Sequence, residues 1–165
     1  MLLRRLILIP LLSASVIAAA DDKAFVTTRT LSMDLANQLA ITSARACAKM
    51  GYQVAVAVTD RSGKLLAFIR DPLAGTHTID VATLKAATAA SFQTATIEMM
   101  KGFEGLRDAP GVLLIGGGVP IRVGGHMYGA IGVSGAPAKK RMGDMDDACA
   151  QAGIDVIREA IEFAQ

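Results

Sequence analysis

Aromatic side chains, histidine and cysteine are scarce in this sequence. Its 165 residues include no tryptophan, two tyrosines, two histidines and two cysteines. No Cys-x-x-Cys pair and no Cys/His cluster occurs, so zinc, iron–sulfur and covalent haem sites are unsupported. The core must therefore be aliphatic, with some of the eight methionines filling its gaps.

The chain also lacks an apolar run long enough to span a bilayer. Arg4 and Arg5 precede an apolar run over residues 6–17, and three alanines follow it at residues 18–20. This pattern is typical of a secretory signal peptide, whereas a spanning helix needs about 20 apolar residues. We expect cleavage of residues 1–20, a loose leader over residues 21–30 and one domain over residues 31–165. The protein is then periplasmic or secreted, without stable membrane insertion; the alternative is an uncleaved membrane anchor.

There is no excess of one charge that would favour a polyanionic partner. The chain has 17 basic and 15 acidic residues. Loss of Arg4 and Arg5 with the signal peptide leaves 15 basic against 15 acidic residues. A chain balanced in this way has no basic excess to indicate a nucleic-acid partner.

Hydrophobic periodicity and turn residues predict an α+β domain. The expected order is α-β-β-α-α-β-β-β-α, with a five-stranded antiparallel sheet and helices packed on it. A stripe of small residues on the first helix favours close packing, and the first and last helices are expected to pair. The predicted helices cover residues 32–50 (or 30–50), 78–92, 94–101 (or 96–101) and 144–163. The predicted strands cover residues 53–59, 64–70, 112–115, 119–123 and 126–133.

Residues 116–135 hold eight glycines, yet they match no phosphate-binding or nucleophile motif. The order of residues fits neither the Walker loop nor G-x-G-x-x-G nor G-x-S-x-G. Gly124 and Gly125 instead predict a two-residue hairpin turn, since glycine readily adopts positive φ. That turn places Val123 opposite His126, and residues 119 and 121 opposite residues 130 and 128. The glycines are thus expected to shape a sheet.

Three stretches together resemble the GlcG/HbpS family, also called the haem-degrading or DUF336 domain. They are "VAVAVTDRSGKLLAFIRD", "LKAATAASF" and "LLIGGGVPIRVGGHMYGAIGVSGAP". Lys85, Ala86, Thr88 and Ala89 match the family's Lys-Ala-x-Thr-Ala, although Leu84 replaces its usual acidic residue. The resemblance implies a profilin- or PAS-like fold, homo-oligomers and, in some members, haem binding. It establishes no enzyme activity, and no catalytic triad stands out among these residues.

Two histidines and a tyrosine are candidate ligand-binding residues. His77 lies in a loop before a predicted helix, where it can ligate haem iron or bind an anion; the alternative is a solvated loop histidine. His126 begins a strand and shares a face with Tyr128. For His126 an ordinary position at the sheet edge is the favoured interpretation.

Two cations complete the candidate set. Lys85 can reach a haem propionate or a small carboxylate, or it can extend along the surface into solvent. Arg122 can bind an acid through two hydrogen bonds, or form an outward salt bridge. Glu159 and Glu162 share a helix face and could hold a metal ion weakly, but a solvated helix face is the favoured interpretation. The methionines, including Met99, Met100 and Met127, are expected to be mostly core filler, and a methionine haem ligand is the less favoured alternative.

Cys47 and Cys149 can pair, because an exported protein meets an oxidising compartment. The alternative is two buried free thiols that act as small apolar side chains.

For function we favour an exported protein that binds haem or a related tetrapyrrole. The alternatives are an enzyme or accessory factor that acts on a small organic acid, and a structural oligomer without a ligand.

Overall fold

A computed structural model describes residues 24–164. The predicted signal peptide, residues 1–20, lies outside the described residues. The element order is α1 (Met33–Lys49), β1 (Ala55–Thr59), β2 (Leu65–Arg70), α2 (Thr78–Phe92), a 3₁₀ turn η1 (Glu104–Leu106), β3 (Gly118–Val123), β4 (His126–Ser134) and α3 (Asp144–Glu162). Ser32 begins α1 as predicted, since its hydroxyl accepts the N–H of Leu35 at 3.2 Å.

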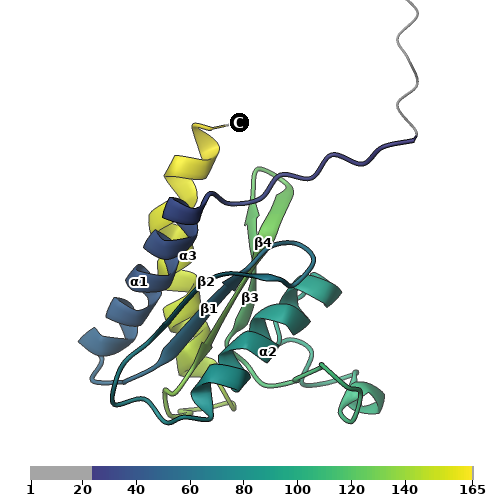
Figure 1. Cartoon of the computed structure of the whole chain (residues 1–165). Helices are drawn as coiled ribbons and strands as arrows, with labels where there is room; N and C mark the ends of the chain where they lie inside the picture. The colour runs from purple at the N-terminus through teal and green to yellow at the C-terminus, as the bar shows by residue number, and fades with distance from the viewer. Residues whose placement is uncertain (1–23, 165) are drawn as a thin grey trace, which may run out of the picture.

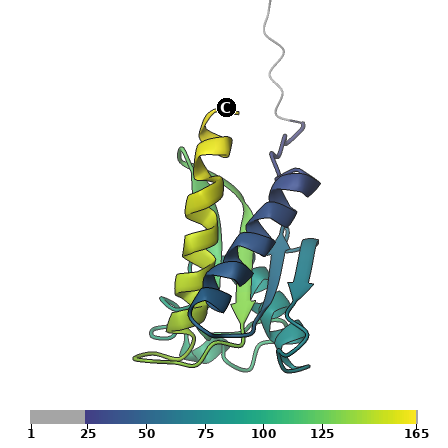
Figure 2. The ribbon, with the colours of Figure 1, turned by 90° about the vertical axis from the view of Figure 1, so that its left-hand side faces the viewer.

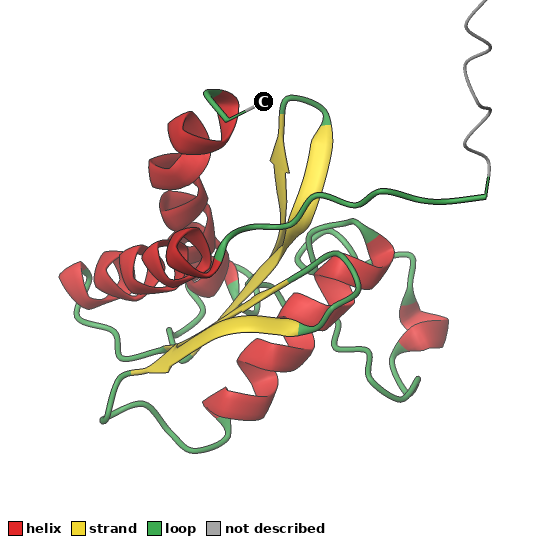
Figure 3. Cartoon of the chain, turned by 45° about the horizontal axis from the view of Figure 1, so that its top comes forward, coloured by secondary structure: helices red, strands yellow, loops and turns green. Residues whose placement is uncertain are grey.

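The four strands form one antiparallel sheet in the order β2-β1-β4-β3. Helices α1 and α3 cover one face and α2 covers the other (Figures 1 and 3). The α+β class is confirmed. The expectation of five strands is wrong, and so is the stated element order, because residues 112–115 form no strand and residues 96–102 form turns in place of a helix.

Both corrections have a local physical reason. The N–H of Leu113 donates to the hydroxyl of Thr88 on α2 at 3.0 Å, so the apolar run at residues 112–115 lies against a helix. The hydroxyl of Thr96 accepts the N–H of Gly118 at 2.9 Å and fastens the turns to the start of β3. Pro120 on the edge strand β3 also lacks an N–H with which to pair another strand.

The two faces of the sheet are packed differently. Strand β1 alternates alanine and valine and is buried on both sides. Its valines join the main core against α1 and α3, whereas Ala55 and Ala57 meet Ala82 and Ala86 of α2. Gly132 lets α2 come closer still, because a Cβ there would overlap the carbonyl oxygen of Ala82.

The hairpin register agrees with the prediction only near its turn. Val123 pairs with His126, but Ile121 pairs with Gly129 and Val119 with Ile131. The register shifts at a β-bulge between Ile121 and Arg122, where β4 contains one extra residue. Beyond the bulge, the side chains of β4 therefore point to the opposite faces of the sheet from those predicted. Ile131 and Val133 therefore join Val119 and Ile121 in the main core.

Helices α1 and α3 pair as predicted. The small stripe on α1 is buried, and Ser43 lies against Gly153 of α3 so closely that a Cβ on this glycine would collide with the Ser43 hydroxyl. Cys47 and Cys149 are joined in a disulfide with 5.5 Å between their Cα atoms. Among residues 24–164, no helix is long and apolar enough to cross a membrane.

Candidate functional site

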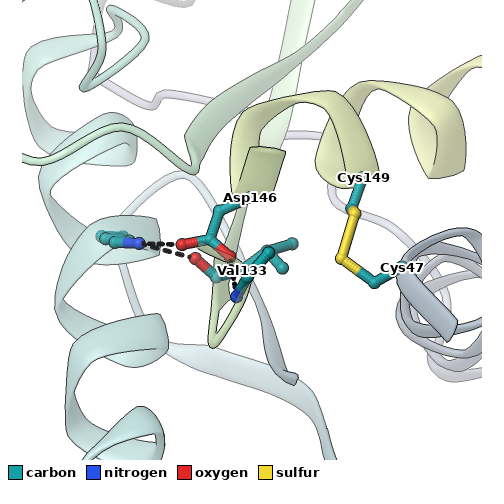
Figure 4. Close-up of a disulfide and its surroundings, with 6 residues drawn as sticks. Cys47, Val133, Asp146 and Cys149 are labelled. Carbon is teal, nitrogen blue, oxygen red and sulfur yellow. Dashed lines mark hydrogen bonds and ion pairs between the residues drawn. A yellow bond between two sulfur atoms is a disulfide. The ribbon is translucent and has the colours of Figure 1, made fainter. Parts of the chain in front are cut away.

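A buried ion pair joins α2 to the first turn of α3. The Nζ atom of Lys85 donates to Asp146 Oδ2 at 2.7 Å and to the carbonyl oxygen of Val133 at 2.9 Å. Only 1% of Lys85 and 3% of Asp146 is exposed. The other carboxylate oxygen of Asp146 accepts the N–H of Ala136 at 2.9 Å (Figure 4). Every oxygen and the ammonium of this pair thus have partners within the protein.

Two glycines make the room that this lysine needs. A Cβ on Gly117 would lie 3.0 Å from Lys85 Nζ, and one on Gly118 would overlap the carbonyl oxygen of Lys85. The glycine run before β3 therefore serves close backbone packing against a buried side chain. It is not arranged as a phosphate-binding loop.

Burial controls the ionisation of this pair. Burial lowers the pKa of Lys85 and raises the pKa of Asp146, while the attraction between the two charges opposes both shifts. The alternative that Lys85 extends along the surface into solvent is wrong, because the side chain is buried; binding of a haem propionate by Lys85 stays a prediction. Its ammonium is already used to fasten α2 to α3.

Asp147 follows this pair and remains half-buried. Its Oδ1 atom is buried and has no hydrogen-bond partner among the described residues. Burial raises the pKa of the Asp147 carboxyl, and the negative charge of Glu98 raises it further. The N–H of Gly117 and the positive charge of Arg141 act in the opposite direction and lower this pKa. The carboxyl therefore lies within electrostatic reach of two surface residues on different loops.

Arg141 and Glu98 belong to a hollow that we call the loop depression. It has a cavity volume of 440 Å³ and shares Met100 and Met142 with an adjoining hollow of 310 Å³. The loop depression is lined by Ile97, Glu98, Met100, Lys101, Lys140, Arg141 and Met142. The adjoining hollow is lined by Met100, Arg107, Leu113, Leu114, Ile115 and Met142.

Asp144 holds in place residues 139–141, the three consecutive cations that we call the basic edge of the loop depression. Its carboxylate accepts the backbone N–H groups of Lys139, Lys140 and Arg141 at 2.9, 2.7 and 3.2 Å. The hydrogen bonds from Lys139 and Lys140 are the main cause that lowers its pKa to about 2. This carboxylate is thus bound to backbone amides, and the three cationic side chains that follow each other here remain exposed.

The lining of the two hollows combines apolar and cationic groups with one carboxylate, that of Glu98. Two thioethers and several aliphatic side chains form the walls, and four basic side chains stand at the edges. Such an arrangement can bind an amphiphilic anion, with the apolar part on the walls and carboxylates at the edge. The thioethers are the soft ligands in the lining that can bind iron or copper.

Comparison with known proteins identifies the family. Residues 31–155 match the family described as haem degrading protein HbpS-like. The chain belongs to the HbpS-like family. A double mutant of HbpS from Streptomyces reticuli shares 35% identity with a TM-score of 0.75, over 87% of this chain and 98% of that chain. The comparison with curated proteins gave no match.

Two further solved structures resemble this HbpS-like chain. The Klebsiella pneumoniae protein ORFY is 25% identical with a TM-score of 0.72, over 79% of this chain and 92% of that one. A PduOC:heme complex is 26% identical with a TM-score of 0.67, over 78% of this chain and 95% of that one.

The predicted ligand-binding residues of this HbpS-like domain do not form one site. His77 is exposed at the start of α2 and its ring lies against Gly75. Arg122 donates to the carbonyl oxygen of Gln93, at the other end of α2, at 2.9 Å. A helix of 15 residues is about 22 Å long, so His77 and Arg122 belong to separate surfaces.

The two remaining candidates lie on the hairpin. His126 is exposed beside the turn, whereas Tyr128 is 5% exposed and belongs to the core beneath α1 and α3. His126 and Tyr128 therefore share no common exposed face. Glu159 and Glu162 are exposed on the last turns of α3, and no group of three or more His, Cys, Asp or Glu residues within residues 24–164 is placed to hold a metal ion.

Sequence reasoning missed the loop depression of this HbpS-like chain. The polar stretch "AKKRMGDMDDA" joins the last strand to the last helix and supplies Lys140, Arg141 and Met142 to the lining. The sequence feature that could have revealed this site is the order of the charged residues. Three consecutive cations, residues 139–141, precede Asp144, whose carboxylate accepts their backbone N–H groups. Met99 and Met127 are core residues as expected, but Met100 is only half-buried and Met142 is 59% exposed, and both line the loop depression.

Proposed function

We propose that this protein is exported and binds haem, or a related tetrapyrrole, in the loop depression and its adjoining hollow. Haem is a flat apolar ring with two carboxylates, and it needs apolar walls beside cationic groups. The observation that carries the proposal is that both hollows share Met100 and Met142 and that each also has basic residues in its lining. The family description and the haem in the PduOC structure support the same ligand class.

Each part of the lining has a proposed role. Lys140, Arg141 and Lys101 bind the propionates, and Met100 and Met142 pack on the ring or offer a thioether to the iron. The fixed geometry of the edge comes from Asp144, which holds the backbone of the basic loop. Haem, when bound, supplies an iron centre with redox and dioxygen chemistry.

Haem titration with an absorption spectrum tests this site. We expect a Soret band with the purified protein, and a loss or shift of the band in Met142→Ala and Met100→Ala. Lys140→Ala with Arg141→Ala should weaken haem binding about 100-fold or more, since each of the two charge-assisted hydrogen bonds contributes about 1.5–3 kcal/mol.

His77→Ala is the matched control, because His77 is the histidine that the sequence proposes as an axial ligand. Its Soret band should resemble that of the unchanged protein. A band that depends on His77 and not on the methionines would move the site to the start of α2. A protein that binds no haem at all would contradict the proposal for this chain.

Export is tested separately by mass. The basic start, the short apolar run and the alanines at residues 18–20 support cleavage after Ala20. Protein recovered from the periplasm or the medium should begin at Asp21. An intact mass that retains residues 1–20 would contradict cleavage.

A further inference from the structure

A hollow with a cavity volume of 210 Å³ lies between α1 and the end of β2, and we call it the helix–strand hollow. Strand β2 is the edge of the sheet opposite to β3. The loop depression belongs to the β3 edge, since it follows Thr96, which is bonded to Gly118. Figure 2 shows α1 in front of the sheet, at an angle to the strands, with β1 and β2 at its right. The helix–strand hollow is lined by Ala44, Arg45, Ala48, Tyr52, Val54, Ile69, Arg70 and Asp71.

The loop after β2 holds the guanidinium of Arg70 in place. Its Nη1 atom donates to the backbone carbonyl oxygens of Asp71, Pro72 and Ala74. The N–H of Asp71 donates to the carbonyl oxygen of Val54 at 3.0 Å, which ties this loop to the residue before β1. A guanidinium has five N–H donors in one plane, and Nη2 and Nε of Arg70 have no partner within residues 24–164. A cation fixed in this way can bind an anion at little cost in conformational freedom.

A second guanidinium and a phenol lie on the helix side of the hollow. Arg45 is exposed on α1, and Tyr52 is half-buried just after this helix. The N–H of Tyr52 donates to the carbonyl oxygen of Cys47 at 3.1 Å, which fixes the backbone there. Neither the Arg45 guanidinium nor the Tyr52 hydroxyl has a hydrogen-bond or ion-pair partner among the described residues. Both groups can therefore donate to a ligand.

The floor of the hollow is aliphatic. Ala44 and Ala48 are four residues apart on α1 and share one helix face, while Val54 is 1% exposed and Ile69 is half-buried. At about 30 Å³ for each water in the liquid, the cavity corresponds to roughly seven waters. This space suits a small organic molecule and is too small for a tetrapyrrole, so a ligand here is independent of haem binding.

Asp71 limits the charge that the hollow can accept. It is half-buried, and its Oδ1 atom accepts the N–H of Leu73 at 2.8 Å. Together with Arg45 and Arg70 it gives the lining two positive charges and one negative charge. One carboxylate on a ligand balances this sum, whereas a second carboxylate would be repelled by Asp71. Inorganic phosphate would leave the aliphatic floor without an apolar partner.

We propose that the helix–strand hollow binds a small organic monocarboxylate that has a short apolar body. Arg45 and Arg70 bind the carboxylate oxygens through charge-assisted hydrogen bonds, and the hydroxyl of Tyr52 donates to the same group. The apolar body lies on the aliphatic floor, which keeps water away from it. The site thus combines a few placed polar groups with apolar walls, as small-molecule sites generally do.

Calorimetric titration of the purified protein with acetate, isovalerate and benzoate tests this site. We expect saturable binding of one molecule per chain, with higher affinity for isovalerate or benzoate than for acetate, because acetate has almost no apolar body. The neutral counterpart of isovalerate, 3-methylbutan-1-ol, and inorganic phosphate should each bind at least about tenfold more weakly than isovalerate. Arg45→Met should weaken isovalerate binding about tenfold or more, since a charge-assisted hydrogen bond is lost. The exposed position of Arg45 leaves the fold intact in this variant.

Two further variants test the polar groups separately. Tyr52→Phe keeps the ring and should weaken isovalerate binding less than Arg45→Met, because only a neutral hydrogen bond is lost. Asp71→Asn can still accept the N–H of Leu73, so the loop is retained. In this variant the affinity for glutarate, a dicarboxylate, should rise relative to that for isovalerate.

Arg61→Met is the matched control, because it removes an exposed arginine from the turn between β1 and β2. It should leave isovalerate binding unchanged, and all four variants should keep the haem affinity of the unchanged protein. Isovalerate binding in a protein that binds no haem would support this site and contradict haem binding alone. Absence of saturable binding for all three acids, equal affinity for isovalerate and its alcohol or phosphate, or unchanged binding in Arg45→Met would overturn the proposal.

Discussion

Asp146 and Cys149 lie three residues apart in the first turns of α3, yet they fasten this helix to two different neighbours. Asp146 accepts a hydrogen bond from Lys85 on α2, and Cys149 is bonded to Cys47 on α1. Figure 4 shows the two side chains pointing to different sides of the helix. The start of α3, and with it the basic edge of the loop depression, is therefore held against the layers on both faces of the sheet.

Replacing Lys85 with methionine should strongly destabilise the protein. The change leaves Asp146 buried without its cation, and removal of one partner from a buried pair costs about 3–5 kcal/mol in the free energy of unfolding. Urea unfolding of both proteins measures the difference. Adding Asp146→Leu to the variant should recover part of the loss, because no uncompensated charge then remains; equal or greater loss in the double variant would contradict this account.

Replacing Asp147 with asparagine should raise the melting temperature at neutral pH. Burial raises the pKa of Asp147 above its ordinary value, so the folded state favours the protonated carboxyl. The contribution of Asp147 to stability is then complete at pH values below the pKa that its carboxyl has in the unfolded chain. This contribution is lost as the pH rises through the higher pKa that the carboxyl has in the folded protein.

Asparagine has no charge to desolvate and can still accept the N–H of Gly117. Its advantage should therefore shrink as the pH is lowered from 7 to the acid range. Thermal unfolding followed at several pH values measures this trend. An advantage that stays constant or grows toward acid pH would show that the Asp147 charge does not oppose folding.

The parts of the fold that local patterns specify could be predicted from sequence. The Ser32 cap, the small stripe of α1 and the Gly124–Gly125 turn each depend on residues close together in the chain. The bulge after Ile121 could not be predicted, because alternation of apolar residues in β4 is compatible with either register. Residues 112–115 have the composition of a strand, but their contact with Thr88 on α2 depends on tertiary structure.

The candidate site was less predictable for a similar reason. Lys85 looks like a surface cation in sequence, and its partner Asp146 lies 61 residues away. The loop depression joins turns at residues 96–102 with the loop before α3, and only their packing brings Met100 beside Met142. The predicted histidines are exposed, but nothing in the local pattern shows that they lie on different surfaces.

Replacing Gly132 with alanine should destabilise the protein far more than the same change at Gly105. A Cβ on Gly132 would overlap the carbonyl oxygen of Ala82, so α2 must move away from the sheet. Overpacking of this kind costs about 1–3 kcal/mol. Gly105 has open space around its Cβ position and a φ outside the left-handed region, which makes Gly105→Ala the matched control. Equal unfolding midpoints for the two variants would refute the close packing of α2.

The Cys47–Cys149 bond should be present in protein recovered from an oxidising compartment. Both cysteines are fully buried, and the bond closes a loop with a sequence separation of 102. A cross-link over about 100 residues restricts the unfolded chain, and loss of such a bond typically costs about 2–5 kcal/mol. Cys47→Ala with Cys149→Ala should lower the free energy of unfolding by an amount in this range.

Thiol counting in denaturant without reductant decides whether the bond forms in solution. We expect no reactive thiol and a monomeric band on a non-reducing gel, because the two cysteines of the chain are bonded to each other. Two reactive thiols per chain would show free cysteines that act only as small apolar side chains. A dimeric band that reductant removes would show a bond between chains. Since Cys149 also anchors the start of α3, its loss should loosen the basic loop, and haem affinity of the double variant should fall together with its stability.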